Sequence, residues 1–208
     1  MTGAAEPRRA VARRLIGGGT AGNEQLTAAT GVVLILLLAA LGVTIVRIGA
    51  LLGAHMFIGL LLLGPVALKM ASTGYRFVRY YARVPAYRAK GPPPDALRAI
   101  APLVVLSTIV VFGTGVALLF AAPSQSGFLR TLHKLSFIAW IAVTALHVLG
   151  HLVELPAALS ADRRLPYDDH GAGRGARLLA LAGALVGGLV LALVLESRFA
   201  AWTAFHHH

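Results

Sequence analysis

The chain has 208 residues, of which 57% are hydrophobic and only 13% are charged, and its mean hydropathy is +0.76. This composition is typical of an integral membrane protein. The absence of cysteine excludes disulfides, cysteine-ligated iron–sulfur clusters and covalent attachment of a c-type haem. The net charge of +11 does not indicate a nucleic-acid partner, because the basic residues alternate with apolar segments instead of forming one patch.

The apolar segments predict an all-α, polytopic membrane bundle of five helices. We expect residues 1–26 to form a basic cytoplasmic tail without a signal peptide of the usual form, and residues 27–197 to form a single transmembrane domain. Residues 198–208 are expected to be a C-terminal tail, in which His206 to His208 look like the remnant of a purification tag.

The first predicted span, 27–46, has about the length needed to cross a hydrocarbon core. Only a tight turn around Arg47 separates it from the second span, so these two helices should form an antiparallel hairpin. The second span carries His55 near its start and Lys69 in its second half, and Gly64-Pro65 should kink it.

A basic and aromatic loop follows the second span and extends to Arg98. Lysine, arginine and tyrosine in such a position are typical of the membrane surface, so we expect a solvated loop. A docking site for an acidic partner or for lipid remains the alternative.

The third span, 100–121, has Gly113 and Gly115 near its middle, where a neighbouring helix or a flat ligand can approach closely. The fourth span follows a short polar turn and should end at Pro156. After a polar loop whose His170 is expected to be solvated, the fifth span, 178–196, offers no candidate ligand and should serve packing.

Three histidines lie in the fourth span. His133 and His147 are 14 positions apart, which in an α-helix places them about 21 Å apart on nearly the same face. His151 and Glu154 extend this face toward the helix end. Ionisable or ligating groups inside a bilayer are costly and usually face a functional site. The alternative is that these histidines only form hydrogen bonds with their neighbours.

The distribution of basic residues predicts the orientation in the membrane. With the N-terminus in the cytoplasm, fourteen Lys and Arg residues lie on the cytoplasmic side and four lie outside. We therefore expect a multi-pass protein of the bacterial inner membrane. His55 and His133 should then lie at the same depth near the outer face, while Lys69 and His147 lie toward the cytoplasm.

Two imidazoles from facing helices, with a flat macrocycle between them, would ligate a b-type haem. His55 and His133 are the candidate pair, and Gly59 leaves room for a porphyrin face. Three cations near this end could pair with the haem propionates: Arg47, Arg130 and Lys134.

Over residues 27–155 the chain resembles the bundled b-type cytochromes of bacterial membranes, which include cytochrome b subunits of hydrogenases and formate dehydrogenases and small quinone-linked cytochromes. In that family one helix carries two histidines spaced as His133 and His147 are, and each ligates one of two haems with a histidine from another helix. His55 matches the second-helix partner of His133. The resemblance implies a four-helix haem-binding core and an electron-transfer role in a quinone-linked oxidoreductase.

The chain departs from the family at the cytoplasmic-side haem. Small quinone-linked members take the partner of that haem from the first helix, which has no histidine here. At the depth of His147 the second helix offers Lys69 and Met70. We expect Lys69 to be hydrogen-bonded or paired with Glu154, and ligation of iron is the alternative. His147, His151 and Glu154 could also form a small divalent-metal site.

The leading functional hypothesis is electron transfer through haem b between an outer-face redox partner and a quinone or redox protein. Membrane lipid is an expected partner, and the chain is expected to form a homo-oligomer or to be a subunit of a larger oxidoreductase. One alternative is a divalent-metal or proton-coupled transporter that uses Lys69, His147, His151 and Glu154. The other is a haemless scaffold or assembly subunit.

Overall fold

The computed structural model describes residues 19–89, 91, 95–162 and 173–206, with the backbone alone for 96, 151–162 and 206. The described part of the chain is helical and contains no strand. Five helices are long and apolar enough to cross a membrane: α2 (Gly19–Val46), α3 (Ile48–Tyr81), α5 (Asp95–Phe120), α6 (Gly127–Asp162) and α7 (Arg174–Leu195). The prediction of an all-α bundle with five spans is confirmed.

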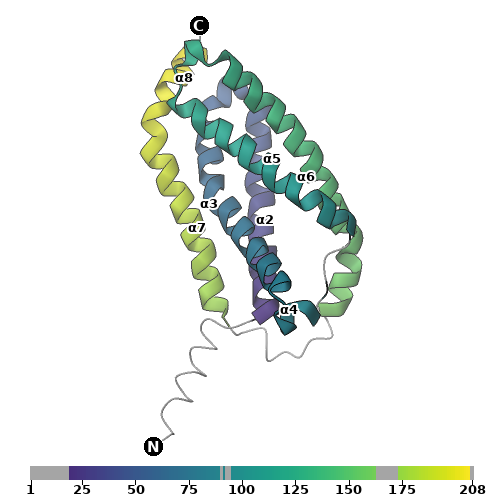
Figure 1. The fold of residues 1–208 in the computed structure, drawn as a ribbon. Helices are drawn as coiled ribbons and strands as arrows, with labels where there is room; N and C mark the ends of the chain where they lie inside the picture. Colours follow the sequence, from purple (N-terminus) through teal and green to yellow (C-terminus); the bar gives the residue numbers. More distant parts are fainter. Residues whose placement is uncertain (1–18, 90, 92–94, 163–172, 207–208) are drawn as a thin grey trace, which may run out of the picture.

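The long helices form two groups that lie side by side (Figure 1). In the first group α3 packs against α2 on one side and α7 on the other, and in the second group α5 packs against α6. Contacts between α3 and α5 are sparse, and within the described residues α6 packs closely on no long helix except α5. Helices in direct contact lie about 8–10 Å apart, so α3 and α6 are separated by more than ordinary helix packing.

Short elements close the two ends of the bundle. The turns between α2 and α3 and between α5 and α6 lie at one end, together with η1 (Pro123–Gln125), η3 (Glu196–Arg198) and α8 (Phe199–His206). The other end holds α4 (Pro85–Ala89), which contacts α2 and α3. His55 and His133 therefore belong to the α8 end, while Lys69 and His147 lie toward the α4 end.

Glycines bring α3 and α7 into backbone contact. A Cβ atom built on Gly64 would overlap the carbonyl of Ala184, and one built on Gly188 would overlap the carbonyl of Leu61. Small residues allow such close approach in membranes, where dispersion contacts between helices supply much of the association energy. The packing role expected for the fifth span agrees with this contact.

The segment after α7 is folded onto the bundle. Phe199 and Trp202 are buried, and the indole Nε1 of Trp202 donates a hydrogen bond to the carbonyl of Leu118 at 3.0 Å. The guanidinium of Arg198 lies 5.2 Å from the centre of the Phe120 ring. Most of the expected C-terminal tail is therefore an ordered helix that covers the end of α5.

One local expectation about proline is wrong, that of a helix end at Pro156. The helix α6 continues through Pro156 to Asp162, because proline removes one backbone hydrogen bond and the neighbouring turns can retain theirs. In α3 Pro65 is buried within the helix, and Leu51 has non-helical backbone angles, with φ −117° and ψ 21°. The break thus lies beside the tight turn at Arg47.

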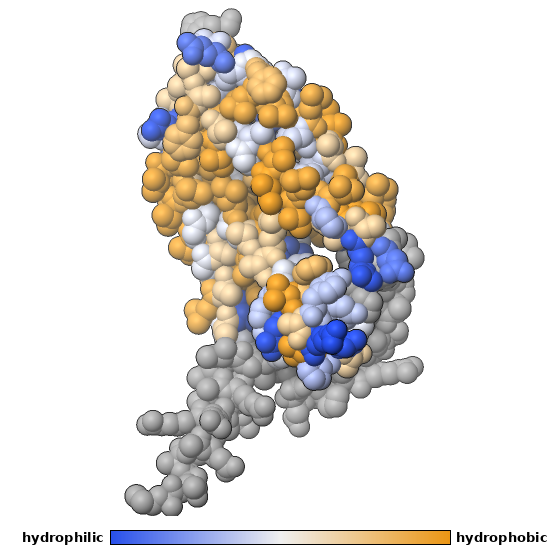
Figure 2. Space-filling model, viewed as in Figure 1, coloured by the Kyte–Doolittle hydropathy of each residue, from blue (hydrophilic) through white to orange (hydrophobic). Residues whose placement is uncertain are grey.

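The outer surface is apolar over the middle of the molecule. Figure 2 shows hydrophobic residues over most of the visible face and hydrophilic residues gathered near the ends. Large apolar side chains are exposed on every long helix, for example Val32, Phe77, Leu106, Ile138 and Leu193. Such a surface is stable only in contact with lipid, so the chain is a multi-pass membrane protein.

Candidate functional site

The imidazole of His55 on α3 is held by a threonine on α2. The Oγ1 atom of Thr44 lies 3.0 Å from Nδ1 of His55 and donates its hydrogen to the carbonyl of Leu41 at 2.6 Å. A hydroxyl has one hydrogen, so Thr44 must accept a hydrogen bond from Nδ1–H. In neutral His55 the lone pair available to a metal is therefore on Nε2.

His133 on α6 has the same arrangement with a threonine on α5. The Oγ1 atom of Thr114 lies 3.0 Å from Nδ1 of His133 and donates to the carbonyls of Val110 and Val111, at 2.8 and 3.0 Å. His133 thus also donates from Nδ1 and has its lone pair on Nε2.

Gly115 makes room for the His133 ring. A Cβ atom at Gly115 would lie only 3.1 Å from Cε1 of His133, so a larger residue would push the imidazole away from α5. The close approach predicted at this glycine is confirmed, although the approaching group is an imidazole. Gly113 has no such neighbour within 4 Å of its Cβ position.

Polar contacts continue along the seam between α5 and α6. The indole Nε1 of Trp140 donates to Oγ1 of Thr108 at 2.9 Å. Ser136 donates to the carbonyl of His133 at 2.9 Å and lies 3.5 Å from Oγ1 of Thr114. Because these contacts fix the rotation of α6 against α5, they also fix the direction of His133.

The structure places the predicted pair at the same end of the bundle. His55 on α3 and His133 on α6 both lie at the α8 end, although α3 and α6 do not pack directly on each other. No atom lies within 4 Å of the Cβ position at Gly59, one turn from His55. Two neutral imidazoles with Nε2 lone pairs are the ligands that a six-coordinate b-type haem requires, so the donor set fits this group.

The three cations proposed for the propionates lie at the same end of the bundle. Arg47 and Lys134 are exposed. Arg130 is half-buried, and its guanidinium lies 5.4 Å from the centre of the Phe205 ring on α8. The contact with Phe205 orients this cation without neutralising it.

Lys69 is directed toward α2. Its Nζ atom donates a hydrogen bond to the carbonyl of Thr27 at 2.7 Å, and Gly31 on the same helix leaves space for the amine, with 3.3 Å between its Cβ position and Nζ. Ser72 and Asn23 extend this polar contact between the two helices. The expectation of a hydrogen-bonded lysine agrees with this geometry.

The other candidate ligands lie farther along α6. His147 is half-buried on that helix. The side chains of His151 and Glu154, and His170 in the following loop, lie outside the described residues. Within the described part of the chain, no group of three or more His, Asp or Glu side chains is arranged to hold a metal ion.

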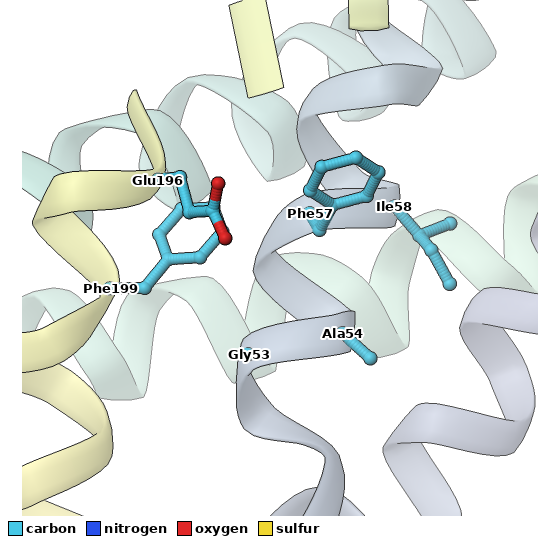
Figure 3. A pocket seen from close by; sticks show the side chains of 6 residues that line it. All are labelled: Gly53, Ala54, Phe57, Ile58, Glu196 and Phe199. Atoms are coloured by element: carbon cyan, nitrogen blue, oxygen red, sulfur yellow. The ribbon is translucent and has the colours of Figure 1, made fainter. Parts of the chain in front are cut away.

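A cavity opens beside the helix that carries His55 (Figure 3). Its volume is about 600 Å³. Gly53, Ala54, Phe57 and Ile58 line it from α3, and Glu196 and Phe199 line it from the segment that links α7 to α8. Glu196 brings the one carboxylate to a lining that is otherwise apolar.

Part of the loop after α3 is folded rather than solvated. Tyr87 on α4 is buried, and its ring meets that of Tyr75 edge-on with centres 6.0 Å apart. The guanidinium of Arg79 lies 5.7 Å from the Tyr75 ring and 5.8 Å from the Tyr87 ring. This cluster attaches α4 to the end of α3.

No protein-family model, characterised protein or solved structure matches the chain. Functional conclusions therefore depend on the side chains described above.

Proposed function

We propose that this protein is a membrane b-type cytochrome that carries single electrons, and that His55 and His133 would hold one haem b. The supporting observation is the pair of threonines at Nδ1, each of which has already donated its hydroxyl hydrogen to a helix carbonyl. Histidines that ligate metals usually donate their other ring N–H in this way, which fixes the tautomer and the ring orientation.

When bound, haem b supplies an iron that takes up and releases one electron. The chain would hold it between the α2–α3 and α5–α6 hairpins, with Nε2 of His55 and Nε2 of His133 directed to the iron. The apolar helices around this position would exclude water. Arg47, Arg130 and Lys134 would neutralise the propionates, which are costly to bury as unpaired charges.

A quinol is the electron donor that the cavity beside His55 would accept. The two phenylalanines and the apolar wall suit a quinone ring, and Glu196 supplies a base. Oxidation of a quinol to a quinone releases two protons and two electrons, so a proton acceptor beside the ring is required. For each electron passed to haem b, the carboxylate would receive one proton from a quinol hydroxyl and pass it to the water outside. The outer-face redox partner would take this electron from the haem, and a second round would remove the second proton and the second electron to give the quinone.

The basic residues support one orientation of the protein in the membrane. The α4 end collects the larger share of Lys and Arg, and the side with more positive charge is the cytoplasmic side. The histidine pair and the Glu196 cavity would then face the outer side of the bacterial inner membrane. Electrons would pass between an outer-face redox partner and the membrane quinone pool.

The decisive experiment is a reduced-minus-oxidised spectrum combined with a haem count per polypeptide. Purified protein should contain about one low-spin haem per chain. His55→Ala or His133→Ala should abolish the low-spin signal, whereas His147→Ala, the matched control on α6, should retain most of it. A normal low-spin spectrum in the His55→Ala, His133→Ala double variant would contradict the proposal.

A further inference from the structure

A groove lies between the beginnings of α2 and α7, at the α4 end of the bundle and far from the histidine pair. Its volume is about 280 Å³. Its polar lining consists of Gln25 on α2 with Arg174 and Arg177 on α7. Its apolar lining consists of Leu26 and Ala29 on α2 with Leu178 and Leu181 on α7.

We infer that this groove binds the headgroup of one anionic phospholipid. The two arginines stand in the first turn of a membrane-spanning helix, which is the level at which lipid phosphates lie. Guanidinium groups bind phosphate oxygens with paired hydrogen bonds, and basic pockets between transmembrane helices are typical sites for anionic headgroups.

The apolar half of the lining identifies a lipid instead of a free anion. Leu26 and Ala29 are three residues apart, as are Leu178 and Leu181, so each pair continues along one face of its helix toward the membrane centre. Leu178 is 57% exposed. Acyl chains that extend from a phosphate at the arginines would cover these side chains.

Size and charge fit one headgroup. A volume of about 280 Å³ lies just below the usual range of small-molecule pockets, about 300–1,000 Å³. The nearest carboxylate along α2 is that of Glu24, which lies 3.8 Å from the guanidinium of Arg76. This ion pair reduces the repulsion that Glu24 would exert on a bound phosphate.

The test is a competition between lipids. Detergent-purified protein is mixed with equal amounts of phosphatidylglycerol and phosphatidylcholine that have the same acyl chains, and bound lipid is measured by native mass spectrometry. Phosphatidylglycerol should predominate. Arg174→Gln and Arg177→Gln should each lower the ratio of the two lipids roughly fivefold, as expected for about one basic residue at the membrane surface.

Arg198→Gln, at the opposite end of the bundle, is the matched control and should leave the ratio unchanged. Glycerol phosphate, which has the anionic group without acyl chains, should not displace the lipid. The inference is overturned if wild-type protein shows no preference, if the Arg174→Gln, Arg177→Gln double variant retains it, or if glycerol phosphate competes equally well. Because the wild-type preference and the glycerol phosphate competition need no variant, they test the inference even if a variant fails to fold.

Discussion

The hydroxyl oxygen of Thr44 lies 3.0 Å from Nδ1 of His55, and its hydrogen is already donated to the carbonyl of Leu41. Thr114 repeats this relationship with His133. In both cases the threonine belongs to the helix that precedes the histidine helix. Each hairpin therefore carries one imidazole whose Nδ1–H is hydrogen-bonded to a threonine. The two histidines lie at the same end of the bundle, one on α3 and one on α6.

Thr44→Val and Thr114→Val test whether these hydrogen bonds act on the proposed haem ligands. Valine has nearly the shape of threonine but cannot accept the hydrogen bond from Nδ1–H. A ligand without this bond donates less electron density to iron and stabilises the ferric state less, so the midpoint potential should rise. A hydrogen bond of about 1 kcal/mol corresponds to roughly 20–60 mV for one electron.

Thr203→Val is the control for those two variants, since Thr203 on α8 donates only to the carbonyls of Phe199 and Ala200. Potentiometric titration of the haem signal gives the measurement. An unchanged potential in both variants would show that the threonines do not act on the ligands.

Sequence periodicity predicted the depth of the histidines because helical rise converts residue number directly into position across a membrane. It did not reveal Thr44 and Thr114. A threonine in an apolar helix commonly bonds a carbonyl of its own preceding turn, so nothing in the local sequence distinguishes one that also meets a histidine. The direction of Lys69 toward α2 depends on Gly31 and Thr27, which are distant in sequence, and the lysine's depth alone could not determine it.

Lys69→Leu tests whether Lys69 has a structural role or ligates haem iron. Because Nζ donates to Thr27 on α2, the haem count and the low-spin spectrum should not change. The carbonyl of Thr27 lies within a helix, so stability should change by no more than about 1 kcal/mol. Haem content and thermal unfolding in detergent check both expectations, and loss of a second haem would show instead that the lysine ligates iron.

Gly188→Ala should destabilise the bundle because the added methyl group would overlap the Leu61 carbonyl and push α7 away from α3. Overpacking of this kind costs about 1–3 kcal/mol. Gly187→Ala is the matched control, since no atom lies within 4 Å of that Cβ position, and alanine should favour the helix by about 0.5–1 kcal/mol. Thermal unfolding midpoints should therefore move in opposite directions, and equal midpoints would contradict the close contact.

Orientation can be tested with reporters. A reporter fused after residue 205 should behave as exported, and one fused to a chain truncated after Ala89 should behave as cytoplasmic, because the positive side of a membrane protein stays inside. Should the first fusion be active only in the cytoplasm, the histidine pair lies at the inner face, and the assignment of an outer redox partner fails.

Glu196→Gln tests the proposed quinol cavity. Glutamine retains the size and hydrogen-bonding capacity of the side chain but cannot take up a proton at neutral pH, and removal of a general base slows proton transfer by about 100-fold or more. Haem reduction by a quinol should therefore slow strongly, whereas reduction by dithionite, which needs no base, should keep its rate.

Phe57→Leu is a second variant of the same cavity, and it should weaken quinol binding without changing the dependence on pH. The two variants together separate proton transfer from ring binding, because only Glu196→Gln removes an ionisable group. Equal rates of quinol-driven reduction in wild-type and Glu196→Gln protein would place quinol oxidation elsewhere on the bundle.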